Sequence, residues 1–343
     1  MSVRTGGAEP QNRGLVIGLV YNCKHDGVGD AEAEYDSMDT VNAIAGALRG
    51  GGHAVKLFEA DGGLAGHLMA EPVDLAFNIA EGIRGRGREA EAPAIFNMLG
   101  IPFAGSDETA LCVALDKNMC KRLLASYGVV SPRGTVISAP GDLEKTDWRF
   151  PVIVKPNAEG SSKGIPDACV AADRAALAAM IEEGLTHYNE SFLVEEYIAG
   201  REFTVGILGN GPAATVFPPM EIAFRHNTYG QYRIYSYDVK QDYRRHVEYA
   251  CPASISPETD AALRRAALTV FNALGCHDFA RVDFRLAEDG TPYFIEINPL
   301  PGLAPDYSDF PMLAQFNGWE YGDLVRGVLR AALLRLGMAR EGE

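Results

Sequence analysis

The chain has 343 residues, of which 47% are hydrophobic and 22% charged, a composition that is ordinary for a globular protein of two or three domains. Its 31 basic and 46 acidic residues give a formal net charge of −15. Because an acidic chain repels a phosphate backbone, we expect no nucleic-acid partner. We also expect no membrane partner, since no apolar run approaches the ~18 residues of a membrane span.

The six cysteines are scattered along the chain and show no metal-ligand spacing. This usage is typical of reduced thiols in a cytosolic protein. The first residues, MSVRTGGAEPQNRG, contain no hydrophobic signal region. We therefore expect a cytoplasmic protein.

Short apolar runs alternate with helical patterns in the first third of the chain. Apolar residues recur at helical spacing from 38 to 48, before the glycines 50–52, and again from 95 to 99, before Gly100. Strands that alternate with helices indicate a parallel α/β sheet, and this first domain should end near residue 116. The strands that we expect here are residues 14–21, 53–60, 73–82 and 101–106.

The rest of the chain mixes strands and helices without a regular alternation. Residues 278–286 and 291–299 flank the turn EDG, which predicts a β-hairpin. Segment 221–249 is rich in Tyr, Arg and His and has no clear periodic element, so we expect a functional loop or lid there. We further expect helices over residues 116–127, 173–184, 258–274 and 324–336, and strands over 150–156, 191–198 and 202–208.

The stretch KPNAEGSSKG, residues 155–164, places Lys155 at a strand end before a loop of glycine and serine. Such loops hold phosphates, because closely spaced backbone N–H groups form a nest for anions. The usual phosphate loop has its lysine after the glycines. A lysine that comes first therefore indicates a different kind of phosphate site.

The predicted hairpin carries an acidic face. Arg281 and Asp283 share a face of one strand, and Glu296 and Asn298 share a face of the other. If the two faces coincide, three oxygen ligands converge in a set that suits Mg²⁺. The alternative is an exposed strand face with a surface ion pair. Together with Lys155 and its loop, the metal interpretation indicates phosphoryl transfer.

Four segments, KPNAEGSSKG, EEYIAGREFTVGIL, ARVDF and IEINPLPG, resemble in order and spacing the ATP-grasp carboxylate–amine ligases of the D-alanine–D-alanine ligase branch. The segment GIPFAGSDETALCVALDKNMCKRLL resembles the connection between that family's first and central domains. The resemblance covers about residues 14–335 and implies a three-domain ATP-grasp fold of the α/β class, with α+β clamp domains that hold ATP between antiparallel sheets. It implies an N-terminal parallel α/β domain (1–116), a central clamp domain (117–202), a C-terminal catalytic clamp domain (203–343) and a homodimer.

The resemblance also assigns the ATP site. Lys117 and Lys155 would hold the α- and β-phosphates, and Glu202 would meet the ribose. Lys240 would approach the γ-phosphate from the long loop. The adenine pocket would be lined by Val194, Glu195 and Tyr197, and the mobile loop that closes over the γ-phosphate and the reacting carboxylate would be Gly160, Ser161 and Ser162.

The remaining roles concern the metal and the reaction. Two Mg²⁺ ions, which Mn²⁺ could replace, would be held by Asp283, Glu296 and Asn298. Arg281 and the Gly302 backbone N–H would stabilise the tetrahedral oxyanion. Glu34 matches the glutamate that grips the ammonium of the first substrate; the alternative is a helix N-terminal glutamate that complements the dipole.

The substrate-site motifs depart from the family in the N-terminal domain and the long loop. Residues 80–82, Ala-Glu-Gly, replace the family's His-Gly turn, and Gln241 replaces its loop tyrosine. The three arginines that follow the turn either read a substrate carboxylate or face solvent. They are Arg84, Arg86 and Arg88.

The departure is also clear after Gly302, where the stretch LAPDYSDFP replaces a Ser-His-Ser type segment that binds the acceptor carboxylate. Tyr307 or Ser308 could partly substitute. Asp306 and Asp309 would repel an anionic acceptor.

The ATP and metal half thus matches the family, and the amino-acid half does not. We therefore expect an ADP-forming ligase that joins a small-molecule carboxylate and an amine, both amino-acid-like, through an acyl phosphate, with changed specificity and a role in a natural-product pathway. One alternative is a true D-alanine–D-alanine ligase of wall synthesis. Others are a non-catalytic nucleotide-binding regulatory or scaffold protein and an ATP-grasp kinase that phosphorylates without ligation.

Overall fold

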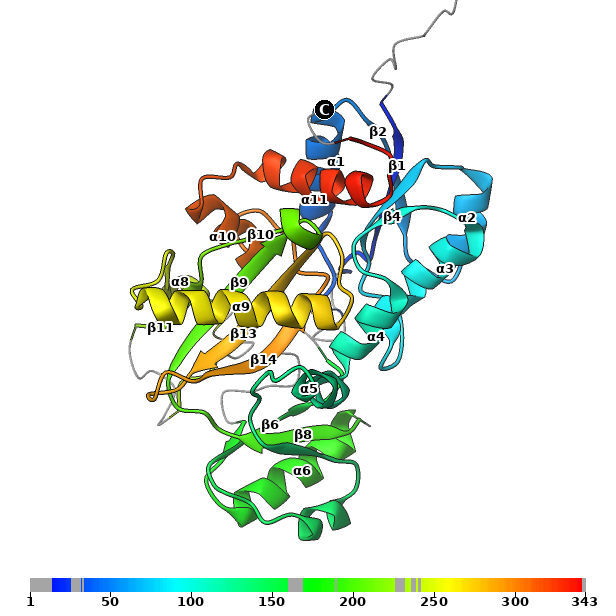
Figure 1. Cartoon of the computed structure of the whole chain (residues 1–343). Coiled ribbons are helices and arrows are strands. Elements are labelled where there is room, and N and C mark those ends of the chain that lie inside the picture. Colours follow the sequence, from blue (N-terminus) through cyan, green and yellow to red (C-terminus); the bar gives the residue numbers. More distant parts are fainter. Residues whose placement is uncertain are drawn as a thin grey trace, which may run out of the picture.

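The computed structural model describes residues 14–25, 32, 34–159, 169–188, 190–225, 232–235, 239 and 242–340. Within these residues the strands form three sheets, and the chain completes one sheet before it starts the next. Figure 1 shows the first sheet at the top, the largest in the middle and the sheet of residues 134–196 at the bottom. This confirms the expected α/β architecture with two clamp domains, while the exact domain boundaries stay predictions.

The N-terminal sheet is parallel throughout, in the order β2-β1-β3-β4. Its central strands are buried because they are almost entirely apolar, as predicted. The sequence patterns did not indicate the short helices α2 and α4. The strands are β1 (Val16–Tyr21), β2 (Ala54–Glu59), β3 (Leu75–Ile79) and β4 (Phe103–Ala104), and the helices are α1 (Met38–Gly50), α2 (Leu64–Ala70), α3 (Glu91–Leu99) and α4 (Glu108–Leu115).

The second sheet is antiparallel, in the order β5-β8-β6-β7, and belongs to the central clamp domain. On β6, Val152 and Val154 point into the core that this sheet shares with α6, whereas Ile153 and Lys155 line a cavity on the other face. This alternation sets which side chains reach the site. The elements are α5 (Lys117–Ala125), β5 (Gly134–Ile137), β6 (Val152–Pro156), β7 (Val170–Ala171), α6 (Arg174–Tyr188) and β8 (Phe192–Glu196).

The third sheet is antiparallel, in the order β12-β11-β9-β13-β14, with β10 paired to β9. Helix α9 packs its apolar stripe against it, and the hairpin β13–β14 is confirmed. The strands are β9 (Arg201–Leu208), β10 (Thr215–Val216), β11 (Met220–Phe224), β12 (Val247–Ala250), β13 (Phe279–Leu286) and β14 (Pro292–Asn298), and the helices are α8 (Tyr243–His246), α9 (Pro257–Ala273), α10 (Asp309–Phe316) and α11 (Tyr321–Arg335).

The prediction that segment 221–249 has no regular element is wrong at both of its ends. Strands β11 and β12 pair there, with Phe224 opposite Val247. Each is short and has polar or aromatic residues on both faces, so no period-2 pattern stands out before the pairing partner is known. Residues 226–231, 236–238 and 240–241 of this segment lie outside the described residues.

The C-terminal helix α11 packs beside α1, so that the N-terminal sheet and the largest sheet share one core (Figure 1). Asp278, which is fully buried before β13, reinforces this junction: it accepts hydrogen bonds from the Gly105 backbone N–H at 2.8 Å and from the Arg335 guanidinium at 2.7 Å. The walls of the cavity are therefore held by a packed and hydrogen-bonded frame. No helix in the described ranges is both long and apolar enough to cross a membrane.

Candidate active site

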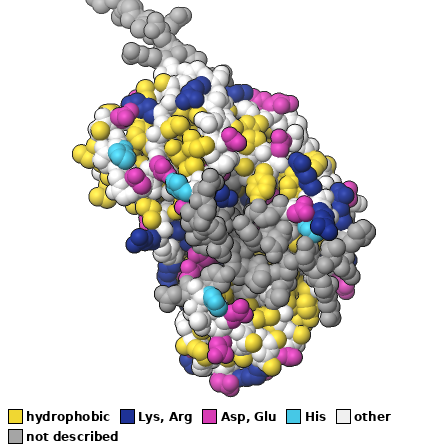
Figure 2. Space-filling model, turned by 180° about the vertical axis from the view of Figure 1, so that it is seen from behind, with side chains coloured by type: hydrophobic (Ala, Val, Ile, Leu, Met, Phe, Trp, Pro, Cys, Tyr) yellow, Lys and Arg dark blue, Asp and Glu magenta, His cyan; other side chains and the backbone are white. Residues whose placement is uncertain are grey.

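A cavity of about 550 Å³ lies where the three sheets meet. Its walls come from the N-terminal domain, from α5, from β6 and β8, and from the hairpin β13–β14 with the segment that follows it. On the outer face shown in Figure 2, Lys and Arg side chains are interspersed with Asp and Glu. Inside the cavity, by contrast, charged side chains of both signs lie close together, among them Lys117, Lys155, Glu195, Arg281 and Asp283.

The structure gathers most of the residues that the sequence assigned to the site. The predicted residues that line the cavity are Glu34, Lys117, Lys155, Glu195, Tyr197, Glu202, Arg281, Asp283, Glu296, Asn298 and Gly302. Val194 does not line it, because strand alternation on β8 turns its side chain into the core of the central domain. The roles predicted for Gly160, Ser161, Ser162, Lys240 and Gln241 concern positions outside the described residues.

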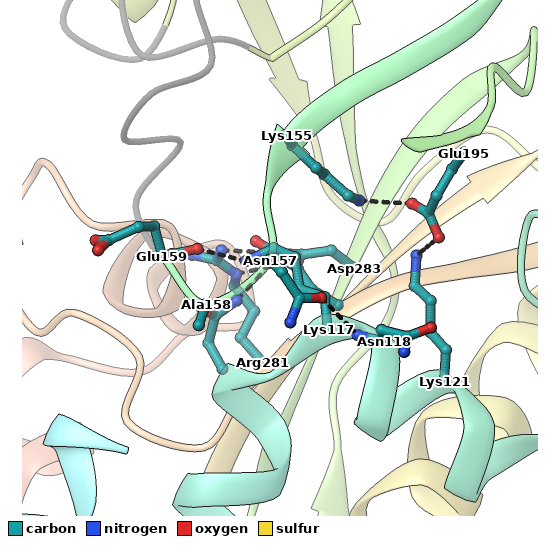
Figure 3. Close-up of polar contacts among 12 residues, drawn as sticks. Lys117, Asn118, Lys121, Lys155, Asn157, Ala158, Glu159, Glu195, Arg281 and Asp283 are labelled. Atoms are coloured by element: carbon teal, nitrogen blue, oxygen red, sulfur yellow. Dashed lines mark hydrogen bonds and ion pairs between the residues drawn. The ribbon is translucent and has the colours of Figure 1, made fainter. Parts of the chain in front are cut away.

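Glu195 joins two lysines at one end of the cavity (Figure 3). One carboxylate oxygen lies 2.5 Å from the Lys121 Nζ, and the other lies 2.8 Å from the Lys155 Nζ. Burial raises the pKa of Glu195, but the two ammonium groups outweigh burial and lower it overall. In the structure the Glu195 carboxylate forms ion pairs with both lysines, and its predicted contact with adenine stays a prediction.

Lys121 is a site residue that the sequence reasoning missed. Burial lowers the pKa of Lys121 to about 8, against the opposing effect of Glu195. The signal was present: Lys121 is four residues after Lys117, so the two lysines lie on one face of helix α5. The Lys121 ammonium reaches Glu195 on β8, and the Lys117 ammonium reaches Glu296 on β14.

Helix α5 is fastened to the end of β6, and this places Lys117 beside the hairpin. The Lys117 backbone N–H donates to the Asn157 carbonyl at 3.0 Å, and the Asn157 amide donates to Asp116, the N-cap of α5, at 2.9 Å. The Lys117 ammonium donates to the Glu159 carbonyl and lies 3.4 Å from a carboxylate oxygen of Glu296. Figure 3 shows Lys117, Asn157 and Glu159 together around the start of α5.

The two strands of the hairpin present their polar residues on one face, as predicted. Arg281 pairs with Asn298 and Asp283 pairs with Glu296 across the ladder. The Arg281 guanidinium donates two hydrogen bonds to Asp283, at 3.0 and 2.9 Å, and the Asn298 amide lies 3.3 Å from the same carboxylate. The salt bridge that was the alternative interpretation is thus present, but it lines the cavity rather than an exposed face.

This face fits a magnesium ion by the chemistry of its donors. Burial raises the pKa of Glu296, but Lys117, Lys155 and Arg281 lower it to about 2, so this carboxylate is ionised at neutral pH. Asp283 and Asn298 add a second carboxylate and an amide oxygen. Among the described residues no group of three His, Cys, Asp or Glu could hold a metal alone. Mg²⁺ commonly takes one or two carboxylates from the protein and completes its shell with phosphates and water, so Asp283, Glu296 and Asn298 would suffice to hold it.

Asp309 occupies the remaining side of Arg281. One Asp309 oxygen accepts from the Arg281 guanidinium at 2.9 Å, and the other accepts from the hydroxyl groups of Tyr249 at 3.2 Å and Tyr235 at 3.4 Å. Asp309 lines the cavity, whereas the exposed Asp306 does not. Of the two aspartates predicted to repel an anionic acceptor, only Asp309 is therefore in a position to do so.

The solvent interpretation of Arg88 is wrong, and the interpretation that it reads a substrate carboxylate stays a prediction, because its partners here are carboxylates of the protein. It is buried and donates to Glu34 at 2.6 Å, to Glu159 at 3.0 Å and to the Ala158 carbonyl at 3.0 Å. Arg84 and Arg86 are exposed. The dipole interpretation of Glu34 also fails, since this residue precedes the N-cap of α1, Ser37, by three positions.

The N-terminal wall is strongly acidic, which the sequence reasoning also missed. Burial, then the neighbouring Glu34, raises the pKa of Glu89 to about 8, and burial raises the pKa of Asp36 to about 7. Burial and the charge of Glu89 raise the pKa of Glu81 as well. Glu81 and Glu89 come from the connection between β3 and α3, and Asp36 comes from the segment before α1, so only the fold brings them together.

The other end of the cavity combines apolar and polar groups. Glu202 lies 3.3 Å from the Arg285 guanidinium, which stands over the Tyr197 ring at 5.6 Å from its centroid. Four isoleucines line the cavity with them: Ile153, Ile198, Ile234 and Ile295. A fifth, Ile297, stands between Glu296 and Asn298 on β14.

Comparison with known proteins places this architecture. The family described as D-ala D-ala ligase C-terminus matches residues 138–330. An uncharacterized protein of Sinorhizobium fredii is 33% identical over 299 residues, which cover 85% of this chain and 86% of the relative. A D-alanine–D-alanine ligase of Cupriavidus metallidurans is 34% identical over 313 residues, which cover 90% of this chain and 91% of the relative.

Solved structures agree on the fold. The D-alanine–D-alanine ligase of Bacillus anthracis complexed with ATP superposes with a TM-score of 0.71 at 22% identity, covering 95% of this chain and all of that one. The VanG D-Ala:D-Ser ligase of Enterococcus faecalis gives a TM-score of 0.72 at 20% identity, covering 93% and 99%. At such identities the likeness establishes the fold alone. With the family match and the sequence relatives, it shows that this chain belongs to the D-alanine–D-alanine ligase family, the ATP-grasp enzymes that form carbon–nitrogen bonds and release ADP.

Proposed function

We propose that this protein joins two amino-acid-like substrates through an acyl phosphate, and that its substrates differ from the two D-alanines of wall synthesis. The observation that carries the proposal is the division of one cavity: its nucleotide and metal end is lined by Lys117, Lys155, Glu202 and the polar face of the hairpin, while its substrate end is lined by carboxyl groups. Family membership alone does not decide the substrates, because specificity depends on the individual site.

The nucleotide end supports ATP binding. The ammonium groups of Lys117 and Lys155 lie beside the hairpin face, where they can neutralise phosphate oxygens. The four isoleucines and Tyr197 offer apolar surface to a purine base, and Glu202 can accept from ribose hydroxyl groups. We propose Mg²⁺ as the metal, held by Asp283, Glu296 and Asn298; when bound, it neutralises charge on the phosphates. That there are two ions stays a prediction, as does the homodimer.

The reaction that fits this arrangement has two steps. An oxygen of the donor carboxylate attacks the γ-phosphorus of ATP, the bond to the β,γ-bridging oxygen breaks, and ADP leaves with that electron pair. The amine nitrogen of the acceptor then attacks the carbonyl carbon of the acyl phosphate. The carbon–oxygen bond breaks, phosphate leaves, and the nitrogen loses a proton to give the amide. Arg281 and the Gly302 backbone N–H would stabilise the oxyanion between attack and departure.

A true D-alanine–D-alanine ligase is the second candidate, and the relatives so named favour it. The acidic Asp309 beside Arg281 speaks against it, because the acceptor D-alanine brings a carboxylate. A non-catalytic protein is less consistent with the site, since Lys117, Lys155, Asp283 and Glu296 are all retained and face one cavity. A kinase that stops at phosphorylation would release ADP and form no amide.

The test is ADP release with MgATP and a panel of D- and L-amino acids, singly and in pairs, with mass spectrometry of each positive reaction. A parallel series contains hydroxylamine, which converts any acyl phosphate to a stable hydroxamate and so identifies the donor without its natural acceptor. A mixed condensed product, or a hydroxamate of a donor other than D-alanine, would support the proposal. D-Alanyl-D-alanine as the main product would establish the second candidate, and no ADP or hydroxamate in any reaction would overturn ligase function.

A further inference from the structure

The described residues at the substrate end of the cavity offer little positive charge to an acceptor. Among the described lining residues, Lys117, Lys155 and Arg285 belong to the nucleotide end. Lys24 lies on the N-terminal wall, where its charge lowers the pKa of Asp36. The carboxylates of that wall outnumber it; they are Glu34, Asp36, Asp39, Glu81 and Glu89.

Arg281 is the remaining cation among the described residues that line the cavity, and its guanidinium is already paired. It donates two hydrogen bonds to Asp283 and one to Asp309, so two carboxylates surround one positive charge. Asp309 is only 1% exposed and is held from the far side by Tyr235 and Tyr249. These partners hold the Asp309 carboxylate in place in the cavity wall that segment 302–309 forms.

That wall lies directly beside the reacting centre. This wall consists of the cavity-lining residues of segment 302–309. Its Asp309 and the proposed metal ligand Asp283 both accept hydrogen bonds from the Arg281 guanidinium. An amine that reaches an acyl phosphate at this face must set its other groups against this wall or against the acidic N-terminal wall. A carboxylate would meet the like charge of Asp309 on one side. On the other side it would meet the carboxyl groups of Glu81 and Glu89, which burial keeps partly protonated and which offer it no counter-ion, so both sides disfavour it in a partly desolvated site.

We propose that the acceptor substrate is an amine that carries no free carboxylate, such as an amino-acid amide or a diamine, and that Asp309 is the residue that selects it. A carboxamide N–H or a second ammonium can donate to the acidic walls where a carboxylate cannot. This inference rests on the proposed ligase function and deepens it. It adds no co-reactant, because the bonds that form and break are those already described for amide formation.

The experiment compares acceptors that differ only in this group: alaninamide against alanine, in both stereoisomers, and glycinamide against glycine. The donor is the carboxylate that gives a hydroxamate with MgATP, held at saturation, and kcat/KM for each acceptor is measured from ADP release and product mass. In the wild type we expect the amide to be preferred over the acid by at least about tenfold. Asp309→Asn should shift this ratio toward the free acid by about tenfold, because it removes the repelling charge and loosens the hold on Arg281.

The ratio between the two enzymes cancels the different basicity of the amide and acid amines. Asp306→Asn is the matched control, since it removes the same charge three positions away, at an exposed residue outside the cavity whose positive φ of 56° asparagine tolerates. Its ratio should equal that of the wild type.

The outcomes distinguish a failure of the proposed acceptor selectivity from a failure of the proposed ligase function. A hydroxamate together with a wild-type preference for free amino acids would overturn the inference and leave the ligase intact. No ADP and no hydroxamate would overturn both. An unchanged ratio in a folded Asp309→Asn protein would remove Asp309 as the selecting residue; if this variant does not fold, the wild-type ratio alone decides.

Discussion

The Lys121 ammonium donates a 2.5 Å charge-assisted hydrogen bond to Glu195, and both side chains are buried beside Lys155. Glu195 thereby balances two positive charges with one carboxylate and fixes the direction of each. Lys121 is consequently a positioning residue: it acts on the nucleotide through Glu195 and Lys155.

We predict that Lys121→Met weakens nucleotide binding and also destabilises the fold. Removing one partner of a buried, hydrogen-bonded ion pair typically costs about 3–5 kcal/mol. Urea unfolding would measure the loss of stability, and calorimetric titration with ATP would measure the loss of affinity. The double variant Lys121→Met, Glu195→Gln should recover part of the stability, because no carboxylate is then left under-paired.

The control for this pair is Arg122→Met, which removes a positive charge from the next position on α5, where the side chain is exposed. It should unfold within about 0.5 kcal/mol of the wild type. If Lys121→Met alone binds ATP as tightly as Arg122→Met does, the positioning role is wrong.

A second prediction concerns the metal ligands proposed on the hairpin β13–β14. Asp283→Asn and Glu296→Gln should each lower turnover by at least about 100-fold, since even groups that only support a metal ligand are worth 10–100-fold. Titration with Mn²⁺, followed by its magnetic resonance signal in the presence of nucleotide, would report metal affinity independently of turnover. Near-normal rates and affinity in both variants would remove the assigned metal site.

The matched control is Asp289→Asn, which changes an acid of the same hairpin at its exposed turn. Asparagine can still accept from the Thr291 backbone N–H, as Asp289 does. Turnover and Mn²⁺ binding should therefore stay close to the wild type.

The sequence predicted the nucleotide and metal end well, because local rules determine it. Two-residue spacing puts Arg281 and Asp283 on one face of β13, and Glu296 and Asn298 on one face of β14. The turn EDG predicts that the two strands pair, and a register shift between Asp283 and Phe284 brings the two polar faces together. The strand alternation that carries Lys155 into the cavity follows from the same period. The same alternation applies to β8: because Glu195 faces the cavity, the side chain of its neighbour Val194 must face the core. Applied to the sequence, this rule would have excluded Val194 from the predicted adenine pocket.

The substrate end was much less predictable, because its groups meet only through the tertiary fold. Arg88 and Glu159 are 71 positions apart, and Arg281 and Asp309 are 28 apart. No spacing rule connects such pairs. Packing decides whether an arginine binds a ligand or neutralises a neighbouring carboxylate. The sequence left Arg88 open between binding a substrate carboxylate and facing solvent, and the structure shows it as the counter-ion of Glu34 and Glu159.

The counter-ion role of Arg88 gives a stability prediction. Arg88→Met should lower the free energy of unfolding by about 3–5 kcal/mol, because it leaves Glu34 and Glu159 buried without their shared counter-ion. Arg84→Met is the control, since it removes an exposed guanidinium from the same loop and should change stability little. Urea unfolding of both variants would decide, and equal losses would show that Arg88 is not a structural counter-ion.

The acidic wall predicts a pH dependence whose sign follows from Glu89. Its pKa is raised from 4.5 to about 8 in the folded protein, first by burial and then by Glu34. Between these values the folded state binds more protons than the unfolded state, so the stabilising contribution is complete below pH 4.5 and is lost as pH rises to about 8. The free energy of unfolding should therefore fall across this window, by up to about 1.4 kcal/mol per pH unit from this group.

Glu89→Gln isolates this effect, because glutamine keeps the shape of the side chain and does not titrate. The slope of unfolding free energy against pH should become shallower in this variant. Glu71→Gln, at an exposed carboxylate whose side chain is 65% accessible, should leave the slope unchanged. Urea unfolding at intervals from pH 4.5 to 8 measures all three slopes. Identical slopes for the wild type and Glu89→Gln would mean that Glu89 is already ionised in the folded protein, and that the N-terminal wall carries a full negative charge at neutral pH.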